Sequence, residues 1–233
     1  MFWKAVFTFL AVMALTLGGT AAGVAGTGGD DVAGGQNVPG KQGGNNGASE
    51  LCGVNAGDSA LSQAEIDSLL FIREEEKVAR DSYMVLEDLW GLVIFANISE
   101  SEQSHMDAVK GLITCYGLTD PVIDQVGTFT DSALQELFDY LMTEGGKSAT
   151  DGLYVGALIE ETDIVDIQAS IDVTSHENIV STYESIMCGS RNHLRAFIRK
   201  IEGNGGSYTP KVLEPAVFWA IAYSPVEQDC GDF

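Results

Sequence analysis

The sequence predicts an all-α protein, a four-helix bundle with a long crossover between the second and third helices and a short C-terminal helix. Three observations carry this prediction. Four segments repeat apolar residues at alternating spacings of three and four, the period of a helix face that packs into a core. The connection between the second and third segments is longer than an antiparallel hairpin requires and suits a crossover. Residues 213–223 are apolar enough to pack as one more short helix.

The first helix is expected to begin after Ser62 and to end near Trp90. Ser62 and Glu65 have the spacing of a capping box. The core-facing stripe of this helix contains one carboxylate, Glu76, among apolar residues. The alternative role for Glu76 is a surface ion pair with Arg80, four residues later. Two neighbouring acids lie off the stripe and are expected to be solvated: Glu74 and Glu75.

The second helix is expected over residues 98–116. Its inward stripe carries both Glu102 and His105, where apolar side chains would be expected. Ser99 and Glu102 also fit a capping box, which would make Glu102 part of a helix start; if Asn97 is the cap, Glu102 is released to face inward. Burying both groups is costly unless each has a partner, and a metal ion is one way to supply it.

Residues 117–150 form the predicted crossover, with one short helix over residues 132–142. The third helix is expected to start near residues 148–151, which have another capping-box pattern. Its stripe is again interrupted by a glutamate, Glu160. The crossover would carry the chain back along the bundle before this third helix begins.

The fourth helix is expected over residues 179–202, with His193 in its inner stripe. His176, in the preceding loop, is expected to be an ordinary surface residue. Three arginines form a separate row four residues apart: Arg191, Arg195 and Arg199. This row is expected to pair with neighbouring acidic helices and the helix C-terminus rather than with a ligand.

Each of the four helices thus places a metal-capable side chain near the middle of its inward stripe. The candidate ligands are Glu76, Glu102, His105, Glu160 and His193. This is the arrangement of a carboxylate-bridged metal site in a four-helix bundle. Carboxylate and imidazole ligands suit iron or manganese, one or two ions, with zinc also able to bind. A small oxidant such as oxygen or peroxide would be the partner of a redox site.

The second hypothesis is a non-catalytic secreted helical module for interaction or structure. The same buried glutamates and histidines would then be satisfied by one another and by Arg80 or Tyr83. Substituting Glu102 separates the two hypotheses, because a buried metal ligand and an exposed acid differ in their contribution to stability.

Two short motifs resemble those of rubrerythrin-type ferritin-like proteins: Glu-Lys-Val-Ala-Arg-Asp-Ser-Tyr over residues 76–83 and Glu-Gln-Ser-His over residues 102–105. Longer motifs resemble a ferritin-like family called domain of unknown function 2202, and they lie at residues 73–81, 97–102, 116–121, 159–164 and 189–197. The resemblance covers about residues 61–223. It implies a ferritin-like fold without a settled activity, and it leaves homo-oligomer formation open.

One position departs from the rubrerythrin pattern. Those proteins carry Glu three residues before the last histidine, whereas this sequence has Ser190, and a hydroxyl cannot bridge two metals as a carboxylate does. The site would hold two metals with water, Asp163 and Glu161 filling in, or only one. A Cys-x-x-Cys segment is also absent from the sequence, so an electron relay of the rubrerythrin kind is not expected.

The composition bears on partners. The net charge is −22, from 34 acidic and 12 basic residues. Nucleic acid is not an expected partner, because no basic surplus is available to neutralise phosphates. Anionic membrane surfaces are disfavoured for the same reason.

Four segments are expected along the chain. Residues 1–25 have the charged start, apolar run and small residues of a secretory signal peptide. Residues 26–60 are rich in Gly and small polar residues and are expected to form a disordered linker. Residues 61–223 form the bundle and residues 224–233 a tail. The protein is therefore expected to be secreted, periplasmic or at the cell surface, without membrane insertion after signal removal; an uncleaved anchor is the alternative.

Four cysteines fit an oxidising compartment and allow three full pairings, among which the sequence does not choose. Cys52 and Cys230 flank the predicted bundle, so a bridge between its two ends is attractive. Cys115 and Cys188 are expected in helices, where they would pair or remain as buried thiols.

Overall fold

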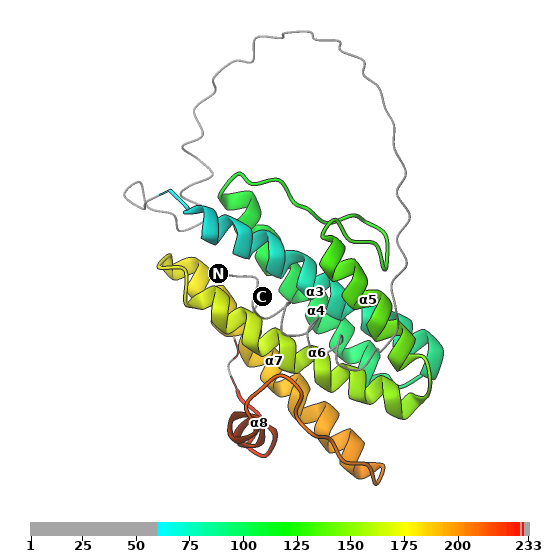
Figure 1. Cartoon of the computed structure of the whole chain (residues 1–233). Coiled ribbons are helices and arrows are strands. Elements are labelled where there is room, and N and C mark those ends of the chain that lie inside the picture. Colours follow the sequence, from blue (N-terminus) through cyan, green and yellow to red (C-terminus); the bar gives the residue numbers. More distant parts are fainter. Residues whose placement is uncertain (1–59, 229, 231–233) are drawn as a thin grey trace, which may run out of the picture.

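The computed structural model describes residues 60–228 and residue 230, and this part of the chain is helical without any β-strand (Figure 1). The helices are α3 (Gln63–Trp90), α4 (Val93–Cys115), α5 (Ser132–Gly145), α6 (Ala149–Ile171), α7 (Glu177–Gly203) and α8 (Pro215–Ala222). The predicted all-α helical bundle is therefore confirmed. Its order also matches the prediction, with α5 inside the crossover and α8 as the short C-terminal helix.

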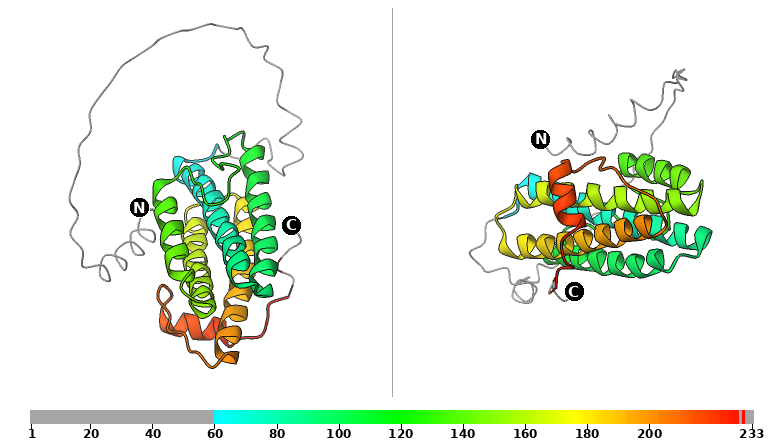
Figure 2. Two further views of the ribbon diagram at one scale, coloured as in Figure 1. Left: turned by 90° about the vertical axis from the view of Figure 1, so that its right-hand side faces the viewer. Right: turned by 90° about the horizontal axis from the view of Figure 1, so that it is seen from below.

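The four long helices form the bundle as two packed pairs. α3 packs along α4, and α6 packs along α7; α3 also contacts α6, and α4 contacts α7. Figure 2 shows these four helices running side by side, with α5 against their flank. α5 packs on both α3 and α6, while α8 packs on α7. The crossover therefore adds a fifth helix over the side of the bundle where α3 and α6 meet.

The core consists of two apolar clusters at opposite ends of the bundle. One is centred on stacked and tilted rings of Tyr83, Phe95 and Phe197, whose centroids are 5.5–6.2 Å apart. The other gathers aliphatic residues such as Leu69 and Val109 around the buried Tyr183. The middle of each long helix lies between these clusters, and this middle layer is polar.

The start of α4 differs from the prediction. The helix begins at Val93, five residues before the expected start, and neither Asn97 nor Ser99 is its cap. Gly91 ends α3 in the left-handed conformation, with φ of 61°, and turns the chain directly into the next helix. Phe95 is fully buried in the ring cluster, so the residues before Asn97 are held in the helix by packing.

Glu74 and Glu75 are buried, and the expectation that they are solvated is wrong. The crossover covers the face of α3 that periodicity assigns to solvent. Glu74 accepts hydrogen bonds from the backbone N–H groups of Thr130 and Asp131, at 2.6 and 3.1 Å. On the same face Lys77 is fully buried, where it pairs with Asp81 at 2.5 Å and donates to two crossover carbonyls. The polar residues of α3 are therefore paired with a segment outside the four-helix core.

His176 is also buried, which corrects its expected surface position. Its Nδ1 lies 2.6 Å from Oε1 of Glu65, the acid of the predicted capping box, which forms at the start of α3. Glu65 accepts further hydrogen bonds from Thr174 and from the N–H and hydroxyl of Ser62. This carboxylate therefore ties the first turn of α3 to the loop between α6 and α7.

The cysteines pair differently from the bridge favoured by the sequence. Cys188 of α7 forms a disulfide with Cys230, so the pairing of Cys230 with Cys52 is wrong. Cys115, at the end of α4, is also disulfide-bonded. The C-terminal segment is held to α7 by a second contact, since Glu227 pairs with Arg191 and Arg195 at 2.5 and 2.7 Å. Two of the three arginines thus pair with an acid of the C-terminal segment rather than with a neighbouring helix as expected.

The predicted signal peptide and nearly all of the predicted linker lie outside the described residues, and both remain predictions. Within residues 60–228, none of the helices combines the length and the hydropathy needed to cross a bilayer.

The Glu65 contacts predict a pH-dependent contribution to stability. Burial alone would raise the pKa of Glu65, but hydrogen bonds from Ser62, Thr174 and His176 outweigh it and lower the pKa from 4.5 to about 2. The stabilisation by the carboxylate is therefore present above pH 4.5 and is lost as the pH falls through 2. Glu65→Gln is expected to lower the free energy of unfolding by about 1–2 kcal/mol at pH 7.

Urea unfolding between pH 2 and 7 measures this difference, which should shrink toward acid pH. Asp88→Asn, an exposed substitution on the same helix, is the matched control and should have little effect. A Glu65→Gln deficit that stays constant over the whole pH range would contradict the proposed role of the charge.

Candidate metal centre

The polar middle layer of the bundle contains all five side chains that the sequence singles out as ligands. They come from α3, α4, α6 and α7, and on each helix they lie between residues of the two apolar clusters. Four of them are buried to 2% exposure or less, and His193 keeps 12% of its side chain exposed. The five residues are Glu76, Glu102, His105, Glu160 and His193.

The first group joins α3 to α4 through Glu76, Glu102 and His105. One potential ligand atom from each lies within 4.8 Å of the others. His105 Nδ1 is 2.6 Å from Glu102 Oε2 and 3.2 Å from Glu76 Oε2. Glu102 and His105 are three residues apart on α4, so both project from the same helix face.

The second group joins α4 to α6 and α7 through Glu102, Glu160 and His193, again with one atom of each within 4.8 Å. His193 Nδ1 is 2.9 Å from Glu102 Oε1 and 3.5 Å from Glu160 Oε2. The two oxygens of Glu102 therefore face different histidines. Because Glu102 belongs to both groups, the two groups form one continuous centre.

Several atoms of this centre are close to one another but lack hydrogen-bond geometry. Among the described residues, no hydrogen bond is made by Glu76 Oε1, either oxygen of Glu102, Glu160 Oε2 or His193 Nδ1. Buried polar atoms are nearly always hydrogen-bonded, so a convergent set of unbonded lone pairs requires an explanation. Metal coordination uses such lone pairs, and the set therefore fits an ion.

The charges in the centre are strongly coupled. Burial would raise the pKa of Glu102, but the adjacent His193 and His105 outweigh it and hold that pKa well below its usual range. Burial raises the pKa of Glu76 to about 7 even though His105 opposes this. Burial would lower the pKa of His193, yet Glu102 and Glu160 raise it to about 10. Without an ion, the histidines are therefore protonated partners of the glutamates at neutral pH.

Surrounding residues fix the orientation of the ligands. The Tyr83 hydroxyl donates a hydrogen bond to Glu160 Oε1, which leaves the other oxygen facing the centre. The Ser190 hydroxyl donates to Asp163 Oδ2 at 2.5 Å, while Asp163 Oδ1 makes no hydrogen bond. Asp163 is 2% exposed. A fourth carboxylate, that of Asp163 on α6, therefore lies beside the centre and is held by Ser190 of the neighbouring helix α7.

Gly189 provides the space for the His105 ring. A Cβ at position 189 would lie 2.7 Å from His105 Nε2 and 2.8 Å from Cε1. Both distances are shorter than real Cβ contacts allow, so any side chain here would displace the imidazole. Helical periodicity does not predict this role of Gly189, because it gives no information about contacts between α4 and α7.

Two residues expected near the centre have other partners. Glu161 points away from it, since its carboxylate accepts hydrogen bonds from Tyr208 Oη and from the backbone N–H groups of residues 211–213. Glu161 therefore does not fill the position that Ser190 leaves open. Arg80 does not pair with Glu76; it contacts Asp81 at 2.7 Å and donates to Gln103.

Most of the chain is similar in sequence to a defined protein family. The family described as "Uncharacterized protein domain (DUF2202)" matches residues 65–225, and the chain belongs to this family. This match includes all but the first two residues of α3, all of α4 to α8 and all five candidate ligands.

A similar protein, covered over most of its length, extends the comparison. "Uncharacterized protein MJ0754" of Methanocaldococcus jannaschii is 45% identical over 169 residues, which are 72% of this chain and 91% of the relative. The crystal structure of hypothetical protein MJ0754 from Methanococcus jannaschii superposes with a TM-score of 0.72 at 44% identity, covering 74% of this chain and 99% of that one. The helical fold of this chain is therefore similar to one that has been solved.

The Gly189 contact predicts that Gly189→Ala will force His105 out of its position. We expect a loss of about 1–3 kcal/mol in the free energy of unfolding, the usual cost of overpacking. Gly111→Ala on α4 is the matched control, because a Cβ there would meet nothing within 4 Å. It should be neutral or slightly stabilising, since alanine is the better helix former.

Thermal or urea unfolding of both variants provides the measurement, with helix content checked by circular dichroism. Equal stability of the two variants would show that the His105 ring adapts to the added methyl group and that Gly189 is not required.

Proposed function

We propose that this protein is an exported, ferritin-like metal-binding protein whose centre holds iron or manganese. The observation that carries the proposal is the shared Glu102, whose two buried oxygens face separate groups of ligands and make no hydrogen bond. One carboxylate between two ligand groups is the arrangement of a bridged pair of ions. The motifs around these residues, which resemble rubrerythrin-type proteins, support the ferritin-like assignment.

The ligand chemistry supports iron or manganese. Three glutamates and two imidazoles form an oxygen-rich set with intermediate nitrogen donors, which suits these metals, and zinc also accepts such a set. Asp163 would complete the carboxylate count at the place where the rubrerythrin pattern has a glutamate on the last helix. Its hydrogen bond from Ser190 holds one oxygen and leaves the other available. The serine would thus orient a carboxylate supplied by α6.

An oxidase or peroxide-handling activity is the extension of this proposal. Iron or manganese would supply electron exchange with a small oxidant such as oxygen or peroxide. The chain itself holds the ligands: Glu102 lies between the two groups, and Tyr83 orients Glu160 through its hydroxyl. The two apolar clusters on either side keep bulk water away from the centre.

Export is supported by the disulfides, because such bonds persist in oxidising compartments. The charged start and apolar run of residues 1–25 support the same address. A secreted, periplasmic or cell-surface location follows from this proposal.

One observation favours a second candidate, a non-catalytic helical module with a degenerate site. His105 lies at ion-pair distance from Glu76 and Glu102, and His193 lies at ion-pair distance from Glu102 and Glu160. The centre is therefore partly neutralised without any ion. Two cations facing three carboxylates would then form a buried polar network that fixes the packing of the four helices.

Metal content separates the two candidates. We expect about two iron or manganese ions per chain in protein purified without chelator or histidine tag, the number a shared carboxylate bridge implies. Glu102→Ala should lose these ions and melt at a markedly lower temperature, because it removes a ligand shared by both groups. Glu100→Ala, an exposed substitution on the same helix, should keep both the metal and the melting temperature.

Elemental mass spectrometry and calorimetry give these values. One ion per chain would indicate a mononuclear site. A wild-type protein that remains free of metal after anaerobic loading with ferrous iron would refute the metal proposal and leave the structural module.

A further inference from the structure

The two histidines of the candidate centre lie on facing helices and stack on each other. The rings of His105 on α4 and His193 on α7 have centroids 5.7 Å apart and planes inclined by 27°. Four positions before each histidine the chain has a small residue, Ser101 on α4 and Gly189 on α7. Residues four positions apart lie on the same face of a helix. Each helix therefore turns one imidazole and one small residue toward the same seam.

Each small residue contacts the histidine of the opposite helix. Gly189 leaves the space that the His105 ring fills, since a Cβ there would lie 2.7 Å from Nε2. Ser101 is half-buried and places its Oγ 3.1 Å from His193 Nε2, at hydrogen-bonding distance. Ser101 is not a member of either ligand group. Its link to the centre is therefore the imidazole of His193.

The hydrogen bond is made by the ring nitrogen of His193 that faces away from the carboxylates. His193 Nδ1 lies 2.9 Å from Glu102 Oε1 and 3.5 Å from Glu160 Oε2, while Nε2 meets Ser101. A half-turn of the imidazole would exchange each nitrogen with a carbon and would break the contacts on both sides. His193 is also the most exposed of the five candidate ligands, with 12% of its side chain accessible. The serine therefore restrains the ring that packing restrains least.

Ser101 differs in this respect from its neighbours on α4. The hydroxyls of Ser99 and Ser104 donate to the backbone carbonyls of Ala96 and Glu100, within their own helix. Such local bonds are common for serine and say nothing about contacts between helices. The Ser101 hydroxyl instead bonds across the bundle to α7.

The chemistry of a ligating histidine gives this second nitrogen its importance. An imidazole that binds an ion through one nitrogen keeps a proton on the other, and a hydrogen-bond acceptor there fixes which nitrogen binds. The Ser101 Oγ has lone pairs that accept from the Nε2–H of His193. The same bond forms when both ring nitrogens carry protons, so the ring keeps one orientation with and without an ion.

We propose that Ser101 is a positioning residue that holds His193 with Nδ1 directed at the centre and Nε2 protonated. This inference rests on the metal-binding function proposed above. Partners of this kind typically contribute about 10–100-fold to metal affinity. The turn of α4 from Ser101 to His105 would then supply two ligands and also the group that orients the histidine of α7.

Titration of the metal-free full chain with Mn²⁺ tests the proposal, with the free ion followed by electron paramagnetic resonance. Ser101→Ala should weaken binding about tenfold or more, because the ring of His193 is no longer held. Ser101→Thr keeps the hydroxyl and should retain most of the affinity. Ser104→Ala, an exposed substitution on the same helix, is the matched control and should bind as the wild type does.

The protonation pattern of the ring gives a readout that a loss of packing alone would not change. In ¹⁵N-histidine-labelled protein loaded with Zn²⁺, nuclear magnetic resonance should show His193 bound through Nδ1, with a slowly exchanging proton on Nε2. Ser101→Ala should make this proton exchange much faster. A zinc-bound Nε2 in the wild-type spectrum would overturn the inference, whether or not the variant folds.

The outcomes separate this inference from the function on which it rests. Wild-type protein that binds no metal would refute the metal-binding function and the inference together. Wild-type protein that binds metal, with Ser101→Ala and Ser104→Ala equal to it in affinity, would overturn the role of Ser101 and leave the metal-binding function intact.

Discussion

The structure depends on the way Glu102 is neutralised. This side chain is fully buried, and its two oxygens lie 2.6 and 2.9 Å from imidazole nitrogens of two different helices. A buried carboxylate is tolerated only with such partners. The four long helices must therefore pack so that α3, α6 and α7 all approach α4 at one height. The apolar clusters above and below supply the burial that holds this arrangement in place.

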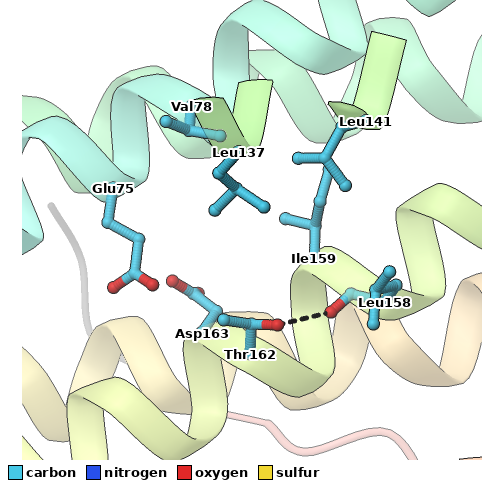
Figure 3. Close-up of a pocket in the computed structure, with 8 residues that line it drawn as sticks. All are labelled: Glu75, Val78, Leu137, Leu141, Leu158, Ile159, Thr162 and Asp163. Atoms are coloured by element: carbon cyan, nitrogen blue, oxygen red, sulfur yellow. Dashed lines mark hydrogen bonds between the residues drawn. The ribbon is translucent and has the colours of Figure 1, made fainter. Parts of the chain in front are cut away.

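The distribution of charge across the bundle is uneven, and this asymmetry organises the polar layer. Both histidines come from α4 and α7, whereas the buried acids that keep an unbonded oxygen and form no ion pair among the described residues, Glu75, Asp163 and Asp166, come from α3 and α6. On the first side Glu102 faces both imidazoles, and on the second Glu75 and Asp163 point toward each other (Figure 3). The crossover lies over this second side, where it also covers Lys77 and Glu74. A fifth helix is therefore packed where the bundle carries its least compensated charge.

Much of the fold and the candidate site could be predicted because both rest on periodicity within single helices. The inward positions of Glu76 and Glu160 follow from the three-and-four spacing of their apolar neighbours. Contacts made by the crossover cannot be predicted in this way, so periodicity places Glu74 and Glu75 in solvent although both are buried. The burial of His176 is not predictable for a similar reason, since it depends on Glu65, which lies 111 residues earlier in the chain. Gly189 gave no signal because its role is the absence of a side chain.

The two helices that contribute histidines are also the two that contain disulfide-bonded cysteines, Cys115 in α4 and Cys188 in α7. The helices that contribute only carboxylates, α3 and α6, contain no cysteine. The disulfides therefore restrain the two histidine-bearing helices covalently, whereas α3 and α6 are held by packing, hydrogen bonds and ion pairs. Reduction of the disulfides would thus remove a covalent restraint from the two histidine-bearing helices and none from α3 or α6.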